Sequence, residues 1–241
     1  MIKLLDILLE EKQEKYHILK QLRSPEDRKK NYLIATQQKI QQYIKNGSKG
    51  DLNLRGTPIT FLPNDLTVGG GLDLYGIPIT SLPNNLKVDG GLDLYGTPII
   101  SLPDNLKVGG SLNLNNTKIT SLPDNLTVDG GLYLYGTPIT SLPDNLTVKG
   151  NLDLRNTPIT SLSNNLKVGG DLYLDGTPIT SLPDNLTVDG GLDLYGTPIT
   201  SLPDNLKVGG DLYLDGTPLS KTHTKEQIRQ MAPSIKGNIF I

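Results

Sequence analysis

The sequence contains no cysteine and no tryptophan, and its 241 residues include only two histidines. The absence of cysteine excludes disulfides, thiolate metal sites and cysteine nucleophiles together. His17 and His223 stand near opposite ends of the chain, so they cannot pair on a metal ion or complete a catalytic triad. We therefore predict a protein that is not an enzyme, with no catalytic residues, no metal site and no cofactor.

Long hydrophobic runs are also missing. No segment reaches the length of a membrane span, and the apolar start is interrupted by Asp6 and ended by Glu10 and Glu11, which is unlike a signal peptide. We expect a cytoplasmic protein without a membrane partner. Secretion as an effector and packaging in a virion both stay open.

Negative charge is concentrated in the middle of the chain. Residues 51–220 contain 18 Asp, no Glu and only 8 Lys or Arg, whereas residues 1–50 contain 11 basic against 6 acidic residues. Residues 221–241 are also basic on balance. Because the acidic part repels phosphate groups, we do not expect a nucleic-acid partner.

A 20-residue unit fills this acidic part and occurs nine times without insertion or deletion. Its pattern is G-L-x-L-x-G-T-P-I-T-S-L-P-D-N-L-T/K-V-x-G. One unit cannot bury six apolar side chains alone, but stacked units can. Leu-x-Leu predicts a short strand that pairs in parallel with its equivalent in the next unit. Two prolines per unit predict a return path made of turns, and the Gly-Gly pairs predict a tight re-entry into the next strand.

The segment Leu92-Asp-Leu-Tyr-Gly-Thr-Pro-Ile-Ile-Ser-Leu-Pro103 resembles the leucine-rich-repeat family, in particular its short bacterial class. The resemblance covers residues 51–220 and would suit a bacterial or phage-encoded protein. It implies a right-handed, curved leucine-rich-repeat solenoid with short parallel β-strands on the concave face and irregular convex turns. One departure is regular: threonine, as at Thr97, stands where the family has asparagine. Its hydroxyl can still bond to neighbouring backbone.

The segments on either side of the repeats predict caps. In residues 1–50, apolar side chains recur at helical spacing between residues 2 and 22. A second helix is expected to start at Ser24-Pro25 and to end at Gly47. Together the two segments predict a helical hairpin. A separate docking or oligomerisation element is the alternative. In residues 221–241, Thr224 and Gln227 predict a capped short helix, and Ile239-Phe240-Ile241 predicts a tenth, closing strand.

Variation between the repeats is concentrated beside the strand leucines, at two positions that point away from the core. Seven of the ten tyrosines lie there. Tyrosine is enriched at binding surfaces, so we predict that these positions contact a partner. The predicted partner-binding residues are Tyr75, Tyr95, Tyr133, Tyr135, Asp153, Arg155, Tyr173, Asp175, Tyr195 and Tyr213.

We therefore interpret the chain as a monomeric, non-catalytic scaffold whose concave Tyr/Asp face recognises a protein, with a basic segment as the fitting partner. The main alternative is an architectural spacer or virion component with no selected face, because tyrosine suits any exposed strand and aspartate aids solubility. Carbohydrate binding, ice binding by the threonine columns and weak Ca²⁺ binding are minor alternatives. Asp153, Asp171 and Asp175 are expected on an open surface, where little would raise a carboxyl pKa.

Overall fold

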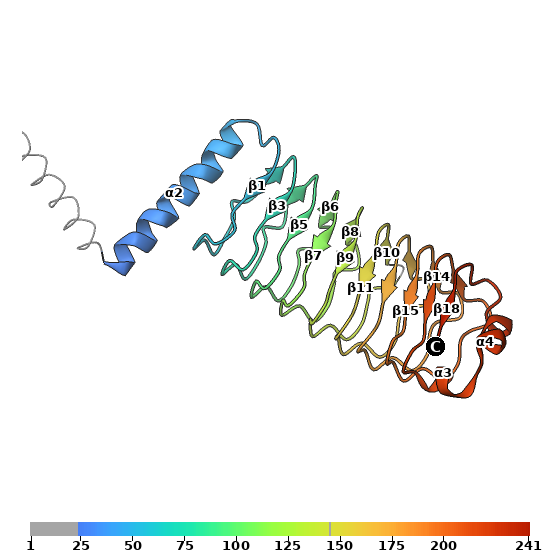
Figure 1. Cartoon of the computed structure of the whole chain (residues 1–241). Coiled ribbons are helices and arrows are strands. Elements are labelled where there is room, and N and C mark those ends of the chain that lie inside the picture. The colour runs from blue at the N-terminus through green and yellow to red at the C-terminus, as the bar shows by residue number, and fades with distance from the viewer. Residues whose placement is uncertain (1–23, 145) are drawn as a thin grey trace, which may run out of the picture.

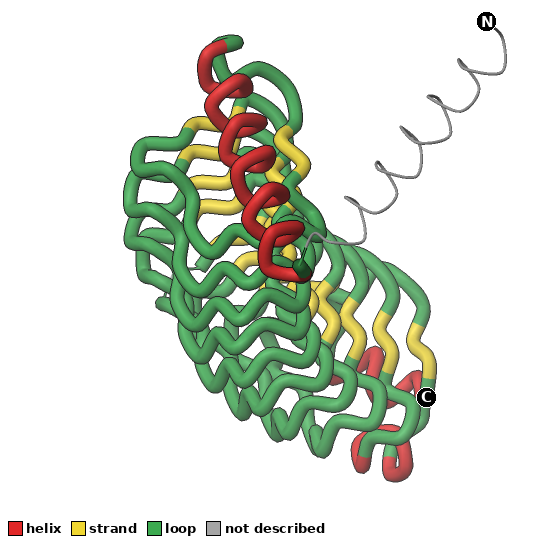
Figure 2. The backbone as a smooth tube through the Cα atoms, turned by 90° about the vertical axis from the view of Figure 1, so that its left-hand side faces the viewer, coloured by secondary structure: helices red, strands yellow, loops and turns green. Residues whose placement is uncertain are grey.

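The computed structural model describes residues 24–144 and 146–241. The repeats form successive coils that stack into an elongated solenoid (Figure 1). Helix α2 (Pro25–Lys45) lies at its first end, and the short helices α3 (Pro218–Thr222) and α4 (Lys225–Met231) lie at its last end. Figure 2 shows α2 lying across the end of the stack. The solenoid predicted from the repeats is confirmed.

The Leu-x-Leu segments form a parallel ten-stranded sheet with one strand from each coil. Leu52 pairs with Leu72, so the pairing register equals the repeat length. The last strand pairs Ile239 with Leu212, which confirms the predicted closing strand. The strands are β1 (Leu52–Asn53), β3 (Leu72–Asp73), β5 (Leu92–Asp93), β7 (Leu112–Asn113), β9 (Leu132–Tyr133), β11 (Leu152–Asp153), β13 (Leu172–Tyr173), β15 (Leu192–Asp193), β17 (Leu212–Tyr213) and β18 (Ile239–Phe240).

A second, eight-stranded parallel sheet runs along the return path of the coils. The sequence predicted only turns there. Each strand has two residues, a Lys or Thr that is mostly exposed and a Val that is buried. Backbone hydrogen bonds join each strand to the next coil, as in the 2.9 Å bond from Asp89 N–H to Val68 O. The strands are β2 (Thr67–Val68), β4 (Lys87–Val88), β6 (Lys107–Val108), β8 (Thr127–Val128), β10 (Thr147–Val148), β12 (Lys167–Val168), β14 (Thr187–Val188) and β16 (Lys207–Val208).

The core is a set of aliphatic columns between the two sheets, and one buried polar column runs beside it. Both leucines of each Leu-x-Leu segment are buried, as at Leu92 and Leu94. Thr97 is buried next to them, and its hydroxyl donates a 2.8 Å hydrogen bond to Leu94 O. The equivalent threonines make the same bond, so the backbone bonding predicted for threonine is confirmed. Because these hydroxyls face inward, they cannot form an ice-binding array.

A column of glycines lets the coils approach closely at the corner between the two sheets. Gly90 N–H donates a 2.9 Å bond to Gly70 O, and the same bond recurs along the stack. A Cβ atom on Gly90 would lie 2.6 Å from the carbonyl carbon of Gly70, which is far inside van der Waals contact. These glycines are therefore needed for close backbone approach. The column contains Gly70, Gly90, Gly110, Gly130, Gly150, Gly170, Gly190, Gly210 and Gly237.

At the first end, α2 covers the open core. Ser24 and Asp27 form a capping box at its start, and Ile40 is buried against the first coil. The Tyr43 hydroxyl lies 2.7 Å from Gly50 O and also accepts a bond from Gly69 N–H, which ties the helix to the first two coils. The predicted helix within residues 2–22 lies outside the described residues, so the hairpin stays a prediction.

At the last end, α4 begins at the predicted capping box of Thr224 and Gln227. The Arg229 guanidinium donates bonds to Ile235 O and, at 2.8 Å, to Gly237 O, so the helix holds the segment that leads into β18. The sequence did not predict α3, which Thr217 caps with its side chain. These contacts close the end of the core.

Candidate functional site

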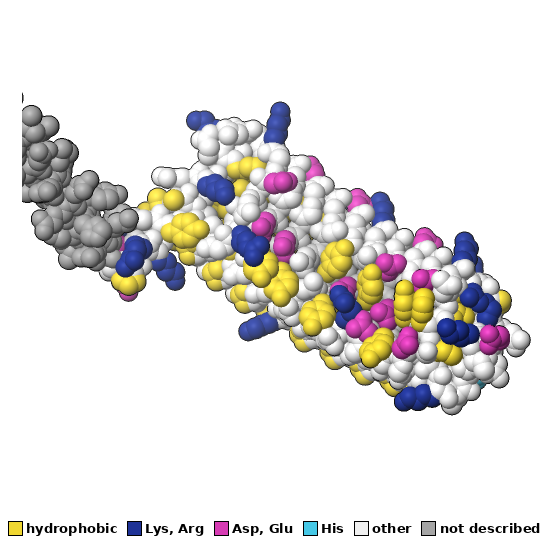
Figure 3. All heavy atoms as spheres, in the orientation of Figure 1, with side chains coloured by type: hydrophobic (Ala, Val, Ile, Leu, Met, Phe, Trp, Pro, Cys, Tyr) yellow, Lys and Arg dark blue, Asp and Glu magenta, His cyan; other side chains and the backbone are white. Residues whose placement is uncertain are grey.

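Aromatic and acidic side chains gather over the ten-stranded sheet (Figure 3). We call this surface the tyrosine face. It consists of the outward side chain of each strand of that sheet, as at Asp73, and of the side chain directly after the second leucine of each Leu-x-Leu segment, as at Tyr75. The predicted tyrosines lie here, outside the hydrophobic core, and Tyr195 is the most exposed at 59%. The prediction that these side chains line one surface is confirmed.

The first part of the tyrosine face is a stack of three flat groups. The rings of Tyr75 and Tyr95 are parallel to within 2°, with centroids 4.8 Å apart. The guanidinium of Arg55 lies 3.8 Å from the centroid of the Tyr75 ring. Arg55 was not among the predicted site residues, although its place in the same variable position was a signal for it. Stacking holds these side chains in one conformation.

The middle of the tyrosine face is built around a buried carboxylate. Asp153 is only 3% exposed, so the expectation that it lies on an open surface is wrong. Arg155 explains the burial, because its Nε and Nη2 donate bonds of 2.9 and 2.7 Å to the two Asp153 oxygens. The same bonds raise the pKa of Arg155 above its ordinary value. A fully charged guanidinium is therefore fixed at the centre of the face.

Two tyrosine rings and a second carboxylate surround this guanidinium. It lies 5.7 Å from the ring centroid of Tyr135 and 5.3 Å from that of Tyr173, within the range of a cation–π interaction. Asp175 Oδ1 lies 3.9 Å from Arg155 Nε. Burial, followed by the charge of Asp193, raises the pKa of Asp175. The expectation that little raises a carboxyl pKa on this surface is therefore wrong for Asp175.

A hydrogen bond fixes the ring of Tyr173, and stacking fixes the ring of Tyr213. The Tyr173 hydroxyl donates a 2.9 Å bond to Asp171, and burial together with this bond raises the pKa of Tyr173 to about 12. The Tyr213 ring stacks on Phe240 with centroids 4.8 Å apart. Phe240 was also missed as a surface residue, although it occupies the place in β18 that Tyr213 has in β17. Each of these rings is held by a contact within the chain.

The aspartates that lie between the two leucines of a Leu-x-Leu segment also have a structural role. Asp73 and Asp93 lie opposite each other on adjacent strands. One oxygen of each accepts the backbone N–H two residues later, at 3.0 Å for Tyr75 and 2.9 Å for Tyr95. Asp193 does the same for Tyr195 at 2.9 Å. These local bonds stabilise the turn at the end of each strand and partly offset the repulsion between neighbouring carboxylates.

A further row of polar residues links one coil to the next just before the strands. Asp51 Oδ1 accepts a 2.7 Å bond from Gly71 N–H, and Asp171 accepts an equivalent bond from Gly191. Ser111, Asn151 and Asp211 do the same. This row was not predicted from the sequence. The signal was that, apart from glycine, only Asp, Asn or Ser occurs at this one position of the repeats.

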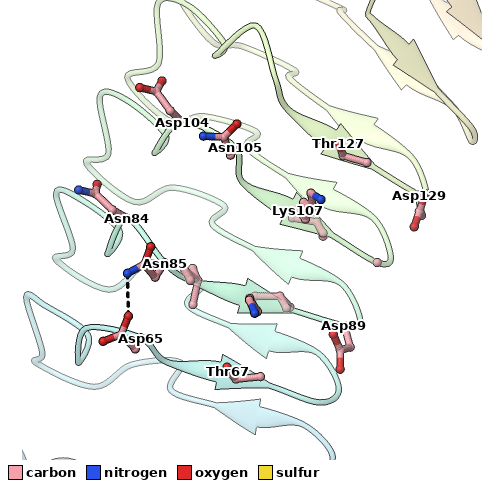
Figure 4. A pocket seen from close by; sticks show the side chains of 15 residues that line it. Asp65, Thr67, Asn84, Asn85, Asp89, Asp104, Asn105, Lys107, Thr127 and Asp129 are labelled. Atoms are coloured by element: carbon pink, nitrogen blue, oxygen red, sulfur yellow. Dashed lines mark hydrogen bonds between the residues drawn. The ribbon is translucent and has the colours of Figure 1, made fainter.

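A groove of about 740 Å³ lies along the eight-stranded sheet (Figure 4). Asn85 donates a 2.7 Å bond to Asp65 at its edge, and Lys87 and Lys107 lie on neighbouring strands within it. Its labelled side chains are exposed, carry both charges and include no aromatic ring. The tyrosine face, with its ordered aromatic and charged groups, is therefore the stronger candidate site.

Two further findings concern the described residues only. In residues 24–144 and 146–241, no three histidine, aspartate or glutamate side chains gather as a ligand set for a metal ion. No helix in the same part of the chain has the length and apolar character needed to cross a membrane.

Comparison with known proteins finds similarity to a solved structure. No family model and no curated protein matches the sequence. A solved leucine-rich-repeat protein from Leptospira interrogans is similar at 24% identity with a TM-score of 0.45. The match covers 77% of this chain and 59% of the Leptospira chain, so this chain spans less than two thirds of it. The fold itself, with one Leu-x-Leu strand per stacked coil, is that of a leucine-rich-repeat solenoid.

Proposed function

We propose that the protein is a non-catalytic scaffold that binds another protein through the tyrosine face. Stacked repeats offer extended surfaces of this kind for recognition. The observation that carries the proposal is that tyrosine and arginine side chains are both accessible and already ordered, as in the Tyr75–Tyr95 stack and the Arg155 cluster. Side chains that are fixed before binding lose little entropy when a partner arrives.

The chemistry of the face favours a protein partner with basic segments. Tyrosine and arginine contribute strongly to protein interfaces when they are surrounded by well-packed neighbours. The 18 aspartates of residues 51–220 give the surface an acidic field that attracts lysine and arginine and repels nucleic acid. We propose that the chain acts as a monomer, because a face that is acidic on balance does not complement itself.

The test uses two exposed tyrosines and a matched aromatic control. Tyr135 and Tyr195 lie on the tyrosine face, whereas Phe61, which is 62% exposed, lies in the return path of the first coil. The full chain, the Tyr135→Ala/Tyr195→Ala variant and the Phe61→Ala variant are immobilised and exposed to lysate from the source organism. Bound proteins are quantified by mass spectrometry, and the dissociation constant of each purified candidate is measured.

The proposal predicts a protein that the full chain and Phe61→Ala bind equally and that the double tyrosine variant binds at least about tenfold more weakly. Melting curves of the three proteins should agree closely, which separates lost binding from lost folding. If no protein distinguishes the double variant from the other two, the face is not a protein-binding surface, and the spacer interpretation is favoured.

A further inference from the structure

The tyrosine face contains one cation-binding arrangement that the chain fills by itself. Arg155, which follows β11, places its guanidinium between the rings of Tyr135 and Tyr173, at 5.7 and 5.3 Å from their centroids. These tyrosines belong to the coils before and after the arginine. Asp153 and Asp175 supply the carboxylates that neutralise it. A guanidinium between two rings two strands apart is therefore an arrangement that this sheet accommodates.

The next interval along the sheet also has two tyrosines two strands apart, but here both lie at the outward position within their strands, and an aspartate rather than an arginine lies between them. Tyr173 in β13 and Tyr213 in β17 are again two strands apart, and the short side chain of Asp193 in β15 lies between them. Since strands are about 4.8 Å apart, the backbone positions that carry the two rings are separated by roughly 9.6 Å. A flat group midway would lie about 4.8 Å from each ring, within the distance of a cation–π contact.

The interval is a groove with acidic edges. Its volume is about 450 Å³, Tyr173 and Tyr213 line it, and glycines such as Gly191 form part of its lining without any side chain. Asp171, Asp193 and Asp211 complete the lining, to which no lysine or arginine of the described part of the chain contributes. Within the described residues, none of these three aspartates takes part in an ion pair. The groove thus combines two ring faces with three uncompensated carboxylates.

We propose that this groove, the Tyr173–Tyr213 slot, binds an arginine side chain of the partner protein. The inference rests on the proposed function and specifies which chemical group the partner presents. A guanidinium is flat, stacks on aromatic rings and donates hydrogen bonds in a plane to carboxylates on either side. A lysine ammonium fits less well because it is compact and strongly hydrated. The Arg155 cluster shows the same pairing of groups within the chain.

The aspartates are already arranged to receive such donors. Asp171 accepts from Gly191 N–H and from the Tyr173 hydroxyl, at 2.7 and 2.9 Å, which fixes both the carboxylate and the ring. Asp193 is fixed by its bond to Tyr195 N–H. Each carboxylate oxygen can accept a further hydrogen bond, so a guanidinium gains partners without displacing those present.

The experiment titrates the full chain with three peptides that differ at one residue. The sequence Ser-Gly-Arg-Gly-Ser is compared with versions carrying citrulline, which keeps the shape and loses the charge, or lysine. Binding is followed by NMR through the backbone amide signals of Gly190, Gly191 and Gly210. The variants are Asp193→Asn and, as the matched control, Asp93→Asn, which occupies the same strand position without tyrosines on the neighbouring strands. Asparagine makes the same local bond at Asn53 and Asn113, so both variants should fold.

If the slot binds arginine, the arginine peptide shifts these signals. The citrulline peptide should bind about tenfold more weakly, and the lysine peptide should also bind less tightly than the arginine peptide. Asp193→Asn should weaken binding of the arginine peptide about fivefold or more. Asp93→Asn should have no effect. Equal weakening by both variants, or equal binding of arginine and lysine, would each overturn the proposal. A partner that depends on Tyr135 and Tyr195 but not on Asp193 would leave the proposed function intact and remove the slot.

Discussion

The glycine column gives the sharpest prediction about the fold. A methyl group on Gly90 would lie 2.6 Å from Gly70 C and 2.7 Å from Gly71 N, both of them backbone atoms that cannot rotate away. Ordinary contacts between such atoms are about 3.5 Å or more, so the two coils must separate locally. Overpacking of this kind costs about 1–3 kcal/mol. We expect Gly90→Ala to lower the free energy of unfolding by that amount.

Gly71 provides the control. It directly follows Gly70, which is the equivalent of Gly90 in the preceding coil. A Cβ atom there would lie 3.5 Å from its nearest neighbours, which is ordinary contact. The chain itself carries Ser111, Asn151 and Asp171 at the equivalent position. Gly71→Ala should therefore change the free energy of unfolding by no more than about 0.5 kcal/mol.

Both variants are compared with the parent protein by urea denaturation followed by far-ultraviolet circular dichroism. The slope of the transition should stay the same, so that the shift in midpoint reports stability. Equal stability of Gly90→Ala and Gly71→Ala would refute the argument that close backbone approach fixes glycine in the column.

Three further predictions follow from single contacts. Thr137→Val removes the 2.7 Å bond from the buried hydroxyl to Leu134 O and should lower the free energy of unfolding, measured by urea denaturation, by about 1 kcal/mol. Thr140→Val, at an exposed position, should leave it almost unchanged. Equal losses of stability would contradict the role of the inward threonines. Because the pKa of Asp175 is raised in the folded state, the folded protein binds this proton more tightly, and stability from this group rises as pH falls through that raised pKa. Asp175→Asn should thus raise the melting temperature at pH 7 and remove part of this pH dependence. A variant that is less stable than the parent protein at pH 7 would show that the contact between Asp175 and Arg155 dominates instead. Deletion of residues 239–241 exposes the edge of β17 and should produce concentration-dependent aggregation in light scattering, while a truncated protein that stays monomeric would show that β18 is not needed to protect that edge.

The repeat pattern made most of the fold predictable. An unbroken spacing between Leu52, Leu72 and their equivalents determines the strand register, because any other pairing would leave leucines outside the core. The closing strand was predictable for the same reason, since Ile239 continues the leucine column. The eight-stranded sheet was not predictable, because a two-residue strand such as Lys87–Val88 has too short a pattern to be told from a turn.

The candidate site was predictable as a surface but less so in its details. Alternation along a strand shows which side chains point outward, and this placed the tyrosines correctly. It cannot show that Arg155 folds back over Asp153, since burial of that carboxylate depends on the conformation of a long side chain on the surface. The pairing of Tyr213 with Phe240 depends on the register of a strand outside the repeats.

Oxidative footprinting of the complex tests the central claim most directly. Hydroxyl radicals label exposed tyrosine and phenylalanine, so labelling of Tyr135, Tyr195 and Phe61 can be compared with and without the purified partner. The account predicts that the partner protects Tyr135 and Tyr195 and leaves Phe61 unchanged. A partner that protects Phe61 while both tyrosines stay fully labelled would contradict the claim that the tyrosine face is the binding surface.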